Sequence, residues 1–165
     1  MACNVSLALK RAGESFPIVW EGRLLPEDFG GENIVFPEPI RFAGEICFDG
    51  DALALTGSCE VTMLRHCARC GALTKQSLPL SFTERFVREG LEEESYAFNG
   101  ESLSLERMFW DGFWLHLTMN ALCREDCKGI CGICGQNRNS GDCNCDRETP
   151  DSKHPFASLR ALYEE

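Results

Sequence analysis

The sequence predicts an α+β fold, in which an antiparallel β-sheet meander packs against one helix and is followed by a small C-terminal cysteine-rich zinc-binding knot. Three observations predict this fold. Apolar and polar residues alternate between positions 40 and 86, apolar residues recur at helical spacing between 105 and 117, and cysteines are concentrated between 123 and 145.

Length and composition allow a substantial apolar core. The chain has 165 residues, of which 44% are hydrophobic and 10% aromatic, so it does not need the disulfide scaffold of very small domains. We expect three parts. Residues 1–120 form a sheet-and-helix domain, residues 121–148 form the cysteine-rich knot as a zinc-binding appendage, and residues 149–165 form a polar tail with a short helix.

The strands are predicted from period-two alternation. Residues 4–9 and 16–25 alternate weakly and predict short strands or an amphipathic opening segment. Residues 40–48 and 53–63 alternate clearly on either side of Asp49-Gly50, which is a two-residue hairpin signal. Residues 78–86 predict a third strand paired with the second, so the chain between these two strands forms a hairpin tip.

One helix is predicted to lie across the sheet. Its apolar face consists of residues at helical spacing, namely Leu105, Met108, Phe109, Phe113 and Leu117. Ser104 is the expected N-cap, and Glu106 in the first turn is favoured by the helix dipole. Before this helix, the acidic residues 89–100 predict a solvated loop, and a second short helix is expected over 156–162.

Eight of the eleven cysteines lie in two clusters with metal-ligand spacing, which are Cys67 with Cys70, and Cys123, Cys127, Cys131, Cys134, Cys143 and Cys145. In a Cys-x2-Cys-Gly turn, backbone amides donate to the sulfur atoms and the glycine permits the tight reversal. Four thiolates in a closed tetrahedron leave no position for water or substrate. We therefore predict about two structural Zn²⁺ ions as the cofactors.

The eight thiols can be paired in more than one way. We favour one site of Cys131, Cys134, Cys143 and Cys145, because the polar loop 135–142 is short enough to fold back on itself. The other site then joins Cys123 and Cys127 to the first cluster at the hairpin tip. The alternative brings the two Cys-x2-Cys turns together as a ribbon and leaves the other cysteines to a second site or to none.

Three cysteines lie outside the clusters, namely Cys3, Cys47 and Cys59. Cys47 and Cys59 are in strand-like runs and are expected to be small buried hydrophobic residues.

Other cysteine chemistry fits the sequence less well. Cys127-x3-Cys131-x2-Cys134 has the spacing of radical enzymes that bind S-adenosylmethionine, but those enzymes place it early in a large barrel, and here it is near the end of the chain. A redox pair requires a helix N-terminus in a βαβ context, whereas the first pair is between strands. The three histidines are isolated and neither a nucleophile elbow nor a phosphate loop is present, so we predict that the protein is not an enzyme.

Charge and hydropathy restrict the partners. The formal net charge is -10, with 26 acidic and 16 basic residues, which disfavours non-specific binding to nucleic acid. The acidic surface would suit a basic protein partner, or it could serve only to keep the protein soluble. The N-terminus does not resemble a signal peptide, and no segment has the length and hydropathy of a membrane span. We therefore expect a cytoplasmic protein with reduced thiols and with neither a membrane partner nor an evident small-molecule substrate.

Two motifs carry a family resemblance. The first is Cys-x-Arg-Cys at 67–70 followed by Pro-Leu-x-Phe at 79–82, and the second is Leu-Cys-x3-Cys-Lys-Gly-Ile-Cys-x2-Cys-Gly-x-Asn-x-Asn-x3-Cys-x-Cys from Leu122 to Cys145. Over about residues 35–162 the chain resembles the bacterial YceD-like family, domain of unknown function 177. The segment from Asp151 departs from the Asp-Pro-Arg-like ending of that family, and many of its members lack the late cysteines.

The resemblance implies a non-catalytic ribosome-biogenesis factor. The family is needed for accumulation of large-subunit (23S) ribosomal RNA, plant relatives are implicated in its processing and in plastid ribosome assembly, and the gene often neighbours that of a small zinc-containing large-subunit ribosomal protein. One mechanism is contact with precursor ribosomal RNA through a patch of Arg65, Arg69, Lys75 and Arg124. Another is chaperoning of, or an adaptor role for, a basic ribosomal protein. Thiol redox activity is the remaining alternative. Convergence of the four basic side chains on one face would favour RNA contact.

Overall fold

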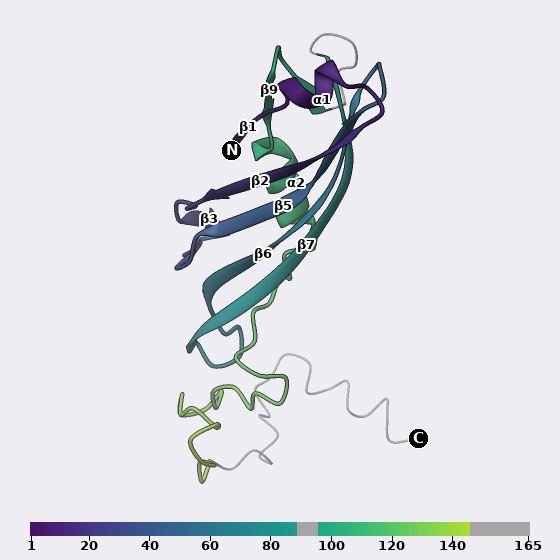
Figure 1. Cartoon of the computed structure of the whole chain (residues 1–165). Helices are drawn as coiled ribbons and strands as arrows, with labels where there is room; N and C mark the ends of the chain where they lie inside the picture. Colours follow the sequence, from purple (N-terminus) through teal and green to yellow (C-terminus); the bar gives the residue numbers. More distant parts are fainter. Residues whose placement is uncertain (89–95, 146–165) are drawn as a thin grey trace, which may run out of the picture.

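A curved five-stranded sheet forms the centre of the molecule (Figure 1). The computed structural model describes residues 1–88 and 96–145. The strands lie in the order β2-β5-β6-β7-β8, spanning Ser15–Gly22, Ile40–Phe48, Leu53–His66, Leu73–Arg88 and Tyr96–Phe98. Neighbours from β2 to β7 are antiparallel, and β8 runs parallel to β7. The predicted α+β fold class is therefore confirmed, and the parallel strand β8 departs from the predicted wholly antiparallel meander.

Short elements complete the fold at the two ends of the sheet. Strands β1 and β9 form a two-stranded antiparallel sheet, and β3 and β4 form a small hairpin. The bounds of these elements and of the two helices are Ala2–Asn4 for β1, Ser102–Ser104 for β9, Glu27–Phe29 for β3, Glu32–Ile34 for β4, Ser6–Lys10 for α1 and Glu106–His116 for α2. In Figure 1, α1 and β9 lie at one end of the long sheet and the cysteine-rich segment lies at the other.

The hairpin of β5 and β6 forms as the alternation predicts, but its loop is longer. Phe48 pairs with Leu53, so the loop has four residues rather than two. The Asp49 carboxylate accepts hydrogen bonds from the backbone N–H groups of Asp51 and Ala52, at 3.0 and 2.8 Å, and Gly50 has φ +105°. The aspartate side chain thus stabilises a wider turn that a two-residue signal does not describe.

Strands β6 and β7 are longer than predicted and pair from Leu53↔Phe86 to His66↔Leu73. Side chains on one face of β6 are buried, while alternate ones such as Thr56 and Ser58 are exposed. The end of this long hairpin projects beyond β2 and β5 toward the cysteine-rich segment (Figure 1). The first cysteine pair therefore lies at a hairpin tip, as predicted.

Helix α2 covers the buried face of the sheet. Met108, Phe109 and Phe113 are buried there, and a Cβ atom at Gly112 would lie 2.5 Å from the Phe82 ring, so the helix backbone closely approaches β7. The helix was expected to be capped by Ser104, but Leu105 occupies the N-cap position. Ser104 instead ends β9, and its hydroxyl accepts from the Glu106 N–H at 3.5 Å.

Three further expectations differ from the structure or fall outside it. Residues 6–10 form a helix, where a strand was one of the two expectations. Residues 96–98, predicted as loop, form β8, while residues 89–95 and the expected helix over 156–162 lie outside the described residues. Among residues 1–88 and 96–145, no helix combines the length and hydropathy that crossing a membrane requires.

Candidate metal centres

Eight cysteine thiols gather into two groups of four. The hairpin tetrad consists of Cys67, Cys70, Cys123 and Cys127, and the knot tetrad consists of Cys131, Cys134, Cys143 and Cys145. Within each tetrad all four sulfur atoms lie within 4.8 Å of one another. These two groups are the ones that the favoured pairing predicts. The two Cys-x2-Cys turns belong to different groups, so these eight cysteines do not form the alternative ribbon. Each tetrad could hold one metal ion.

The two Cys-x2-Cys-Gly turns have the same backbone structure. In the first, the Cys67 N–H donates to the Ala72 carbonyl at 2.9 Å and the Gly71 N–H donates to the Cys67 carbonyl at 2.8 Å. Both turns end in a glycine with positive φ, +70° at Gly71 and +74° in the second turn. The same two hydrogen bonds recur in the second turn, both at 2.8 Å, from Cys131 to Gln136 and from Gly135 to Cys131. The same turn structure therefore positions two of the four thiols in each tetrad.

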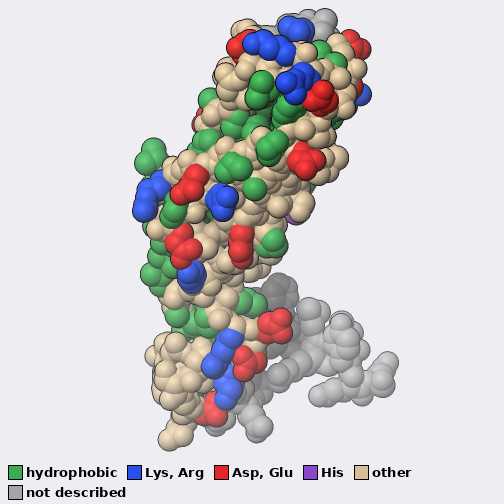
Figure 2. All heavy atoms as spheres, in the orientation of Figure 1, with side chains coloured by type: hydrophobic (Ala, Val, Ile, Leu, Met, Phe, Trp, Pro, Cys, Tyr) green, Lys and Arg blue, Asp and Glu red, His purple; other side chains and the backbone are tan. Residues whose placement is uncertain are grey.

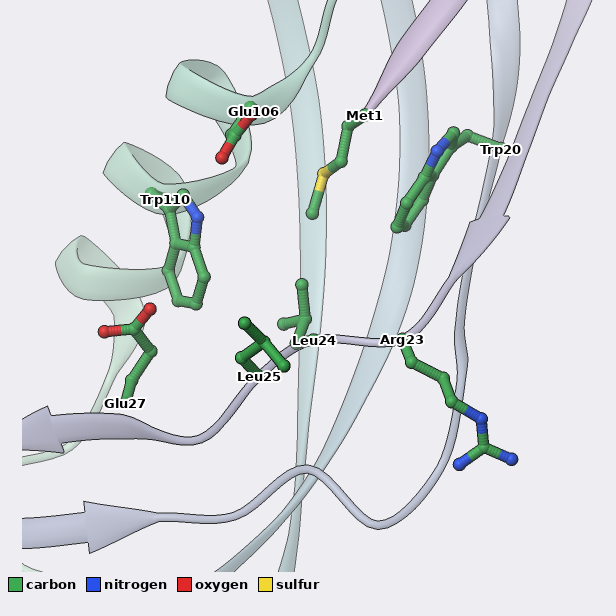
Figure 3. A pocket seen from close by; sticks show the side chains of 8 residues that line it. All are labelled: Met1, Trp20, Arg23, Leu24, Leu25, Glu27, Glu106 and Trp110. Atoms are coloured by element: carbon green, nitrogen blue, oxygen red, sulfur yellow. The ribbon is translucent and has the colours of Figure 1, made fainter.

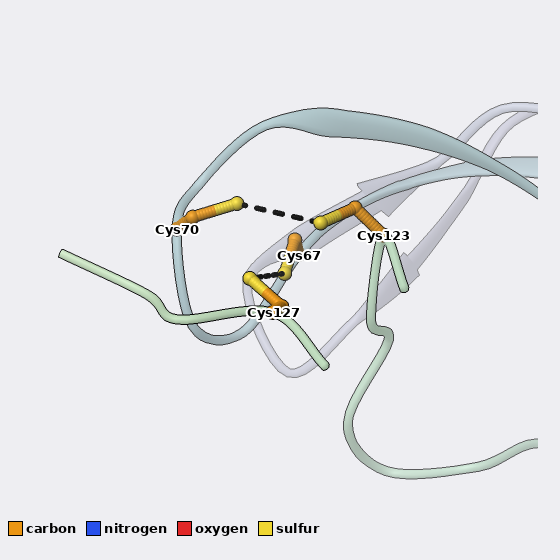
Figure 4. A group of neighbouring side chains, drawn as sticks. All are labelled: Cys67, Cys70, Cys123 and Cys127. Atoms are coloured by element: carbon orange, nitrogen blue, oxygen red, sulfur yellow. Dashed lines mark hydrogen bonds between the residues drawn. The ribbon is translucent and has the colours of Figure 1, made fainter. Parts of the chain in front are cut away.

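The hairpin tetrad joins parts of the chain that are far apart in sequence. In Figure 4, Cys67 and Cys70 from the tip between β6 and β7 face Cys123 and Cys127 from the segment that follows α2. The sulfur atoms of Cys70 and Cys123 are 3.7 Å apart, and those of Cys67 and Cys127 are 3.8 Å apart. The cysteine-rich knot is thus held at the end of the long hairpin.

Backbone hydrogen bonds support this contact. The Ala68 N–H donates to the Ala121 carbonyl at 2.8 Å, and the Ile130 N–H donates to the Arg69 carbonyl at 3.1 Å. The Arg69 guanidinium in turn donates to the carbonyl of Cys127 at 3.1 Å. Gly129, with φ +71°, allows the close approach, because a Cβ atom there would lie 3.0 Å from the Arg69 carbonyl oxygen. The hairpin tip and the knot therefore contact each other beyond the thiols.

Asn139 lies in the loop between Cys134 and Cys143, holds this loop against the segment that carries Cys127, and was not singled out from the sequence. Its amide nitrogen donates to the Cys127 sulfur at 3.3 Å. Its side-chain oxygen accepts from the Arg124 guanidinium at 2.8 Å and from the Lys128 N–H at 2.9 Å, and its own N–H donates to Asn137 at 2.9 Å. The Asn-x-Asn spacing within the second motif was the available signal for this role.

The thiols of the hairpin tetrad differ in acidity. Hydrogen bonds from the backbone N–H of Cys123, and then from those of Arg69 and Cys70, lower the pKa of Cys67 to about 6. The Asn139 amide lowers the pKa of Cys127. Hydrogen bonding to Cys127, followed by burial, raises the pKa of Cys123 to about 12. Ionisation of one thiol disfavours ionisation of its neighbour, and a cation between the four sulfurs would favour the thiolate form of all of them.

The knot tetrad repeats this pattern. Hydrogen bonds from the backbone N–H groups of Cys134 and Ile133 lower the pKa of Cys131. Hydrogen bonding to Cys134 raises the pKa of Cys145 to about 12.

Arg65 was expected in a surface patch, and the structure places it inside the protein. Its side chain is 2% exposed. It donates to a Glu32 carboxylate oxygen at 3.0 and 2.9 Å and to the carbonyls of Thr118 and Met119 at 2.7 and 3.2 Å. Position 65 continues the buried alternation of β6, which is why this arginine points inward. It joins β4 to the segment that leads from α2 to the knot.

The other three basic residues of the expected patch are exposed but have partners. Lys75 forms an ion pair with Glu38 at 2.6 Å, and Arg124 lies 3.3 Å from Asp126 as well as contacting the loop asparagine. Arg69 donates to backbone carbonyls of the knot. On the face seen in Figure 2, basic and acidic side chains are interspersed. Because Arg65 is buried and the other three have acidic or backbone partners, the four residues do not form one exposed patch of unpaired cations.

Among the cysteines outside the tetrads, Cys59 is buried as expected, and burial raises its pKa to about 11. Cys47 is only half-buried, because it lies on the face of β5 away from α2.

Comparison with known proteins places these motifs in a family. The model of the family described as "Large ribosomal RNA subunit accumulation protein YceD" matches residues 55–163. "Large ribosomal RNA subunit accumulation protein YCED homolog 1, chloroplastic" of Arabidopsis thaliana is 23% identical over 156 residues, which cover 74% of this chain and 49% of the relative. Uncharacterized proteins of Mycobacterium bovis and Mycobacterium tuberculosis are 28% identical over 92 residues, 52% of this chain and 44% of theirs.

The chain thus spans about half the length of the curated relatives it matches. No solved structure matches it. The family match covers more than half of the chain and includes most of β6, all of β7 and α2, and both tetrads. The chain therefore belongs to the family of the large ribosomal RNA subunit accumulation protein YceD.

Proposed function

We propose that this protein is a non-catalytic ribosome-biogenesis factor that supports the synthesis, processing or accumulation of large-subunit (23S) ribosomal RNA. Membership of the YceD family is the observation that carries this proposal. The name of the Arabidopsis relative, which refers to large ribosomal RNA subunit accumulation, supports it. The closed form of both tetrads is consistent with a structural rather than a catalytic use of the cysteines.

Each tetrad would hold one Zn²⁺ ion. An all-sulfur donor set suits zinc and does not suit Mg²⁺ or Ca²⁺, which prefer oxygen ligands. Zinc–sulfur bonds of about 2.3 Å place the sulfurs of a regular tetrahedron about 3.8 Å apart. The separations of 3.7 and 3.8 Å across the hairpin tetrad agree with that value. The divalent charge would also offset the repulsion between neighbouring thiolates.

Zinc would supply the stability that the knot lacks as a separate unit over residues 121–148. In its described part, the buried side chains are those of Ala121, Cys127 and Cys131, while Ile130 and Ile133 are 55% and 65% exposed. So few buried apolar groups contribute little free energy of folding, and metal–thiolate bonds take the place of a core.

Contact with a protein partner is the mechanism that the charges favour. The chain has a net charge of -10, and the guanidinium of Arg65 is used internally. The excess of 26 acidic over 16 basic residues opposes binding to a phosphate backbone, which depends on counterion release by basic side chains. An acidic chaperone or adaptor for a basic large-subunit ribosomal protein is accordingly the form of the proposal that we prefer to direct contact with precursor RNA.

Deletion of the gene in its native host tests the function. The ratio of mature 23S to 16S RNA should fall, and the wild-type gene should restore it. Cys131→Ser should restore it poorly, whereas the matched control Cys47→Ser, outside both tetrads, should restore it fully. A normal RNA ratio in the deletion strain would remove the proposal.

Affinity capture from the same host, with and without ribonuclease, distinguishes the two mechanisms. A chaperone or adaptor should retain a basic ribosomal protein after ribonuclease treatment. Loss of every ribosomal component on treatment, together with tight and steeply salt-dependent binding of purified protein to naked precursor RNA, would favour direct RNA contact instead.

A further inference from the structure

A pocket of about 230 Å³ lies between the first turns of α2 and the connection from β2 to β3 (Figure 3). Its apolar walls include Trp20 from β2, Leu24 and Leu25 from the connection, and Trp110 from α2. In Figure 3 the two indole rings stand on opposite sides of the space, with the Met1 side chain between them at one edge and the leucines between them at its base. The pocket is remote from both tetrads in sequence and uses none of their residues.

The wall that Trp110 provides is fixed by packing. Its ring meets those of Phe109 and Phe113 edge-on, with centroids 5.2 and 5.5 Å away, and stacks on Trp114 at 5.8 Å. Leu25, in contrast, is 80% exposed and is not part of the core. A rigid aromatic wall opposite an exposed leucine leaves apolar surface that an incoming apolar group would cover.

Two carboxylates stand at the edge of the pocket, Glu27 from β3 and Glu106 from α2. Within residues 1–88 and 96–145, neither carboxylate forms an ion pair. Arg23 is the basic side chain among the lining residues, and Figure 3 shows its guanidinium turned away from Glu27 and Glu106. Cations beside an apolar group would therefore meet two available acidic partners.

Size restricts the occupant further. Sites for small molecules usually have volumes of about 300–1,000 Å³. A pocket of about 230 Å³ is smaller and suits a single large apolar side chain. A nucleic-acid base could stack on a tryptophan, but its phosphates would approach Glu27 and Glu106, which repel them.

We propose that this pocket binds one large apolar side chain from a basic segment of a partner protein, with flanking Lys or Arg side chains paired to Glu27 and Glu106. The inference rests on the protein-mediated form of the proposed function and gives the chemistry by which the partner would be recognised. Burial of the apolar side chain supplies most of the affinity, and the two ion pairs set the preference for a basic sequence.

Titration of the purified protein with blocked pentapeptides tests the proposal. The probe is Lys-Lys-Phe-Lys-Lys, compared with Lys-Lys-Ser-Lys-Lys and Glu-Glu-Phe-Glu-Glu, and the readout is the indole N–H resonances of Trp20 and Trp110. The first peptide should shift both resonances with saturation, while the other two should bind about tenfold more weakly or not at all.

Matched variants locate the site. Leu25→Ser should weaken binding of the first peptide about tenfold, whereas Leu115→Ser, at a leucine that is also 80% exposed but lies outside the pocket, should leave it unchanged. Replacing both Glu27 and Glu106 by glutamine should weaken binding about threefold and flatten its salt dependence. The corresponding double change at Glu45 and Glu60, exposed on the far face of the sheet, should not.

Several results would overturn the inference. Equal binding of the serine peptide would mean that charge alone attracts the probe, and equal losses in the two leucine variants would place the site elsewhere. A larger shift of the two resonances with oligouridylate would assign the pocket to a base, and absence of any shift at millimolar peptide would show that it binds no such segment. Normal 23S RNA in the deletion strain would refute the proposed function without altering the peptide result, so the two failures are distinguishable.

Discussion

Replacing Arg65 by alanine should cost about 3 kcal/mol of unfolding free energy. Among the described residues, Arg65 is the charged side chain that is buried, and it makes two hydrogen bonds to Glu32 and two to backbone carbonyls. Removal of one partner from a buried ion pair typically costs about 3–5 kcal/mol. The lower end applies because Glu32 retains 22% of its side-chain exposure and can be solvated after the change.

Urea unfolding followed by tryptophan fluorescence measures this cost. Arg65→Lys should recover only part of the stability, because an ammonium cannot reproduce the forked contacts of a guanidinium. Arg41→Ala, at an exposed arginine on the neighbouring strand β5, is the matched control and should change the unfolding free energy by less than about 0.5 kcal/mol. A loss below about 1 kcal/mol for Arg65→Ala would refute the assignment of Arg65 as a stabilising link between β6, β4 and the segment that follows α2.

Three further perturbations give distinct results. Burial alone would raise the pKa of Glu32, but hydrogen bonds from the His66 backbone N–H and the Arg65 guanidinium outweigh it and lower this pKa. The contribution of Glu32 to stability is therefore present above its unfolded pKa of about 4.3 and is lost as the pH falls through the folded value. The stability difference between wild type and Glu32→Gln should shrink between pH 6 and 3, and a constant difference would contradict this. Chelation should release about two zinc ions per chain and make the knot protease-sensitive before the sheet. Cys131→Ser should reproduce this effect locally, whereas Cys47→Ala should cost only about 1 kcal/mol of unfolding free energy. Metal analysis that finds iron, or no metal in a protein with a folded knot, would exclude the zinc sites. Gly112→Val should destabilise the protein by more than about 2 kcal/mol, because the new side chain would meet the Phe82 ring, and a melting temperature equal to that of wild type would show that the helix can move away.

The central sheet was predictable because one physical pattern defines it. Alternation over β5, β6 and β7 gave the strands, their order and the face that α2 covers. The parallel strand β8 was not predictable, since three residues after an acidic stretch are too few to establish a period. The Asp49 loop was predicted too short, because the dipeptide signal does not show that the aspartate side chain hydrogen-bonds two backbone amides.

The candidate metal centres were predictable in their ligands but not in the contacts around them. Cysteine spacing indicated the eight candidate ligands and one Cys-x2-Cys-Gly turn in each tetrad, but it left two pairings open, because the partners of a turn depend on the fold of the chain. Arg65 was misplaced because its charge suggested exposure, while the alternation of β6 pointed inward and a distant glutamate supplied the partner. The role of Asn139 depends on where a loop folds in space, which local sequence does not reveal.

The wide sequence separation within the hairpin tetrad has a consequence for the order of assembly. Its thiol contacts join positions 53 and 60 residues apart, whereas the knot tetrad closes within residues 131–145. Local loops close with less entropy loss than long ones, so the knot tetrad can take up its ion first, as an independent folding nucleus. The hairpin tetrad is complete only after β6, β7 and α2 have brought their ends together. If both tetrads bind metal as proposed, occupancy of the hairpin tetrad would report that the β6–β7 hairpin and α2 are in place, and a chain with one ion would be a folding intermediate.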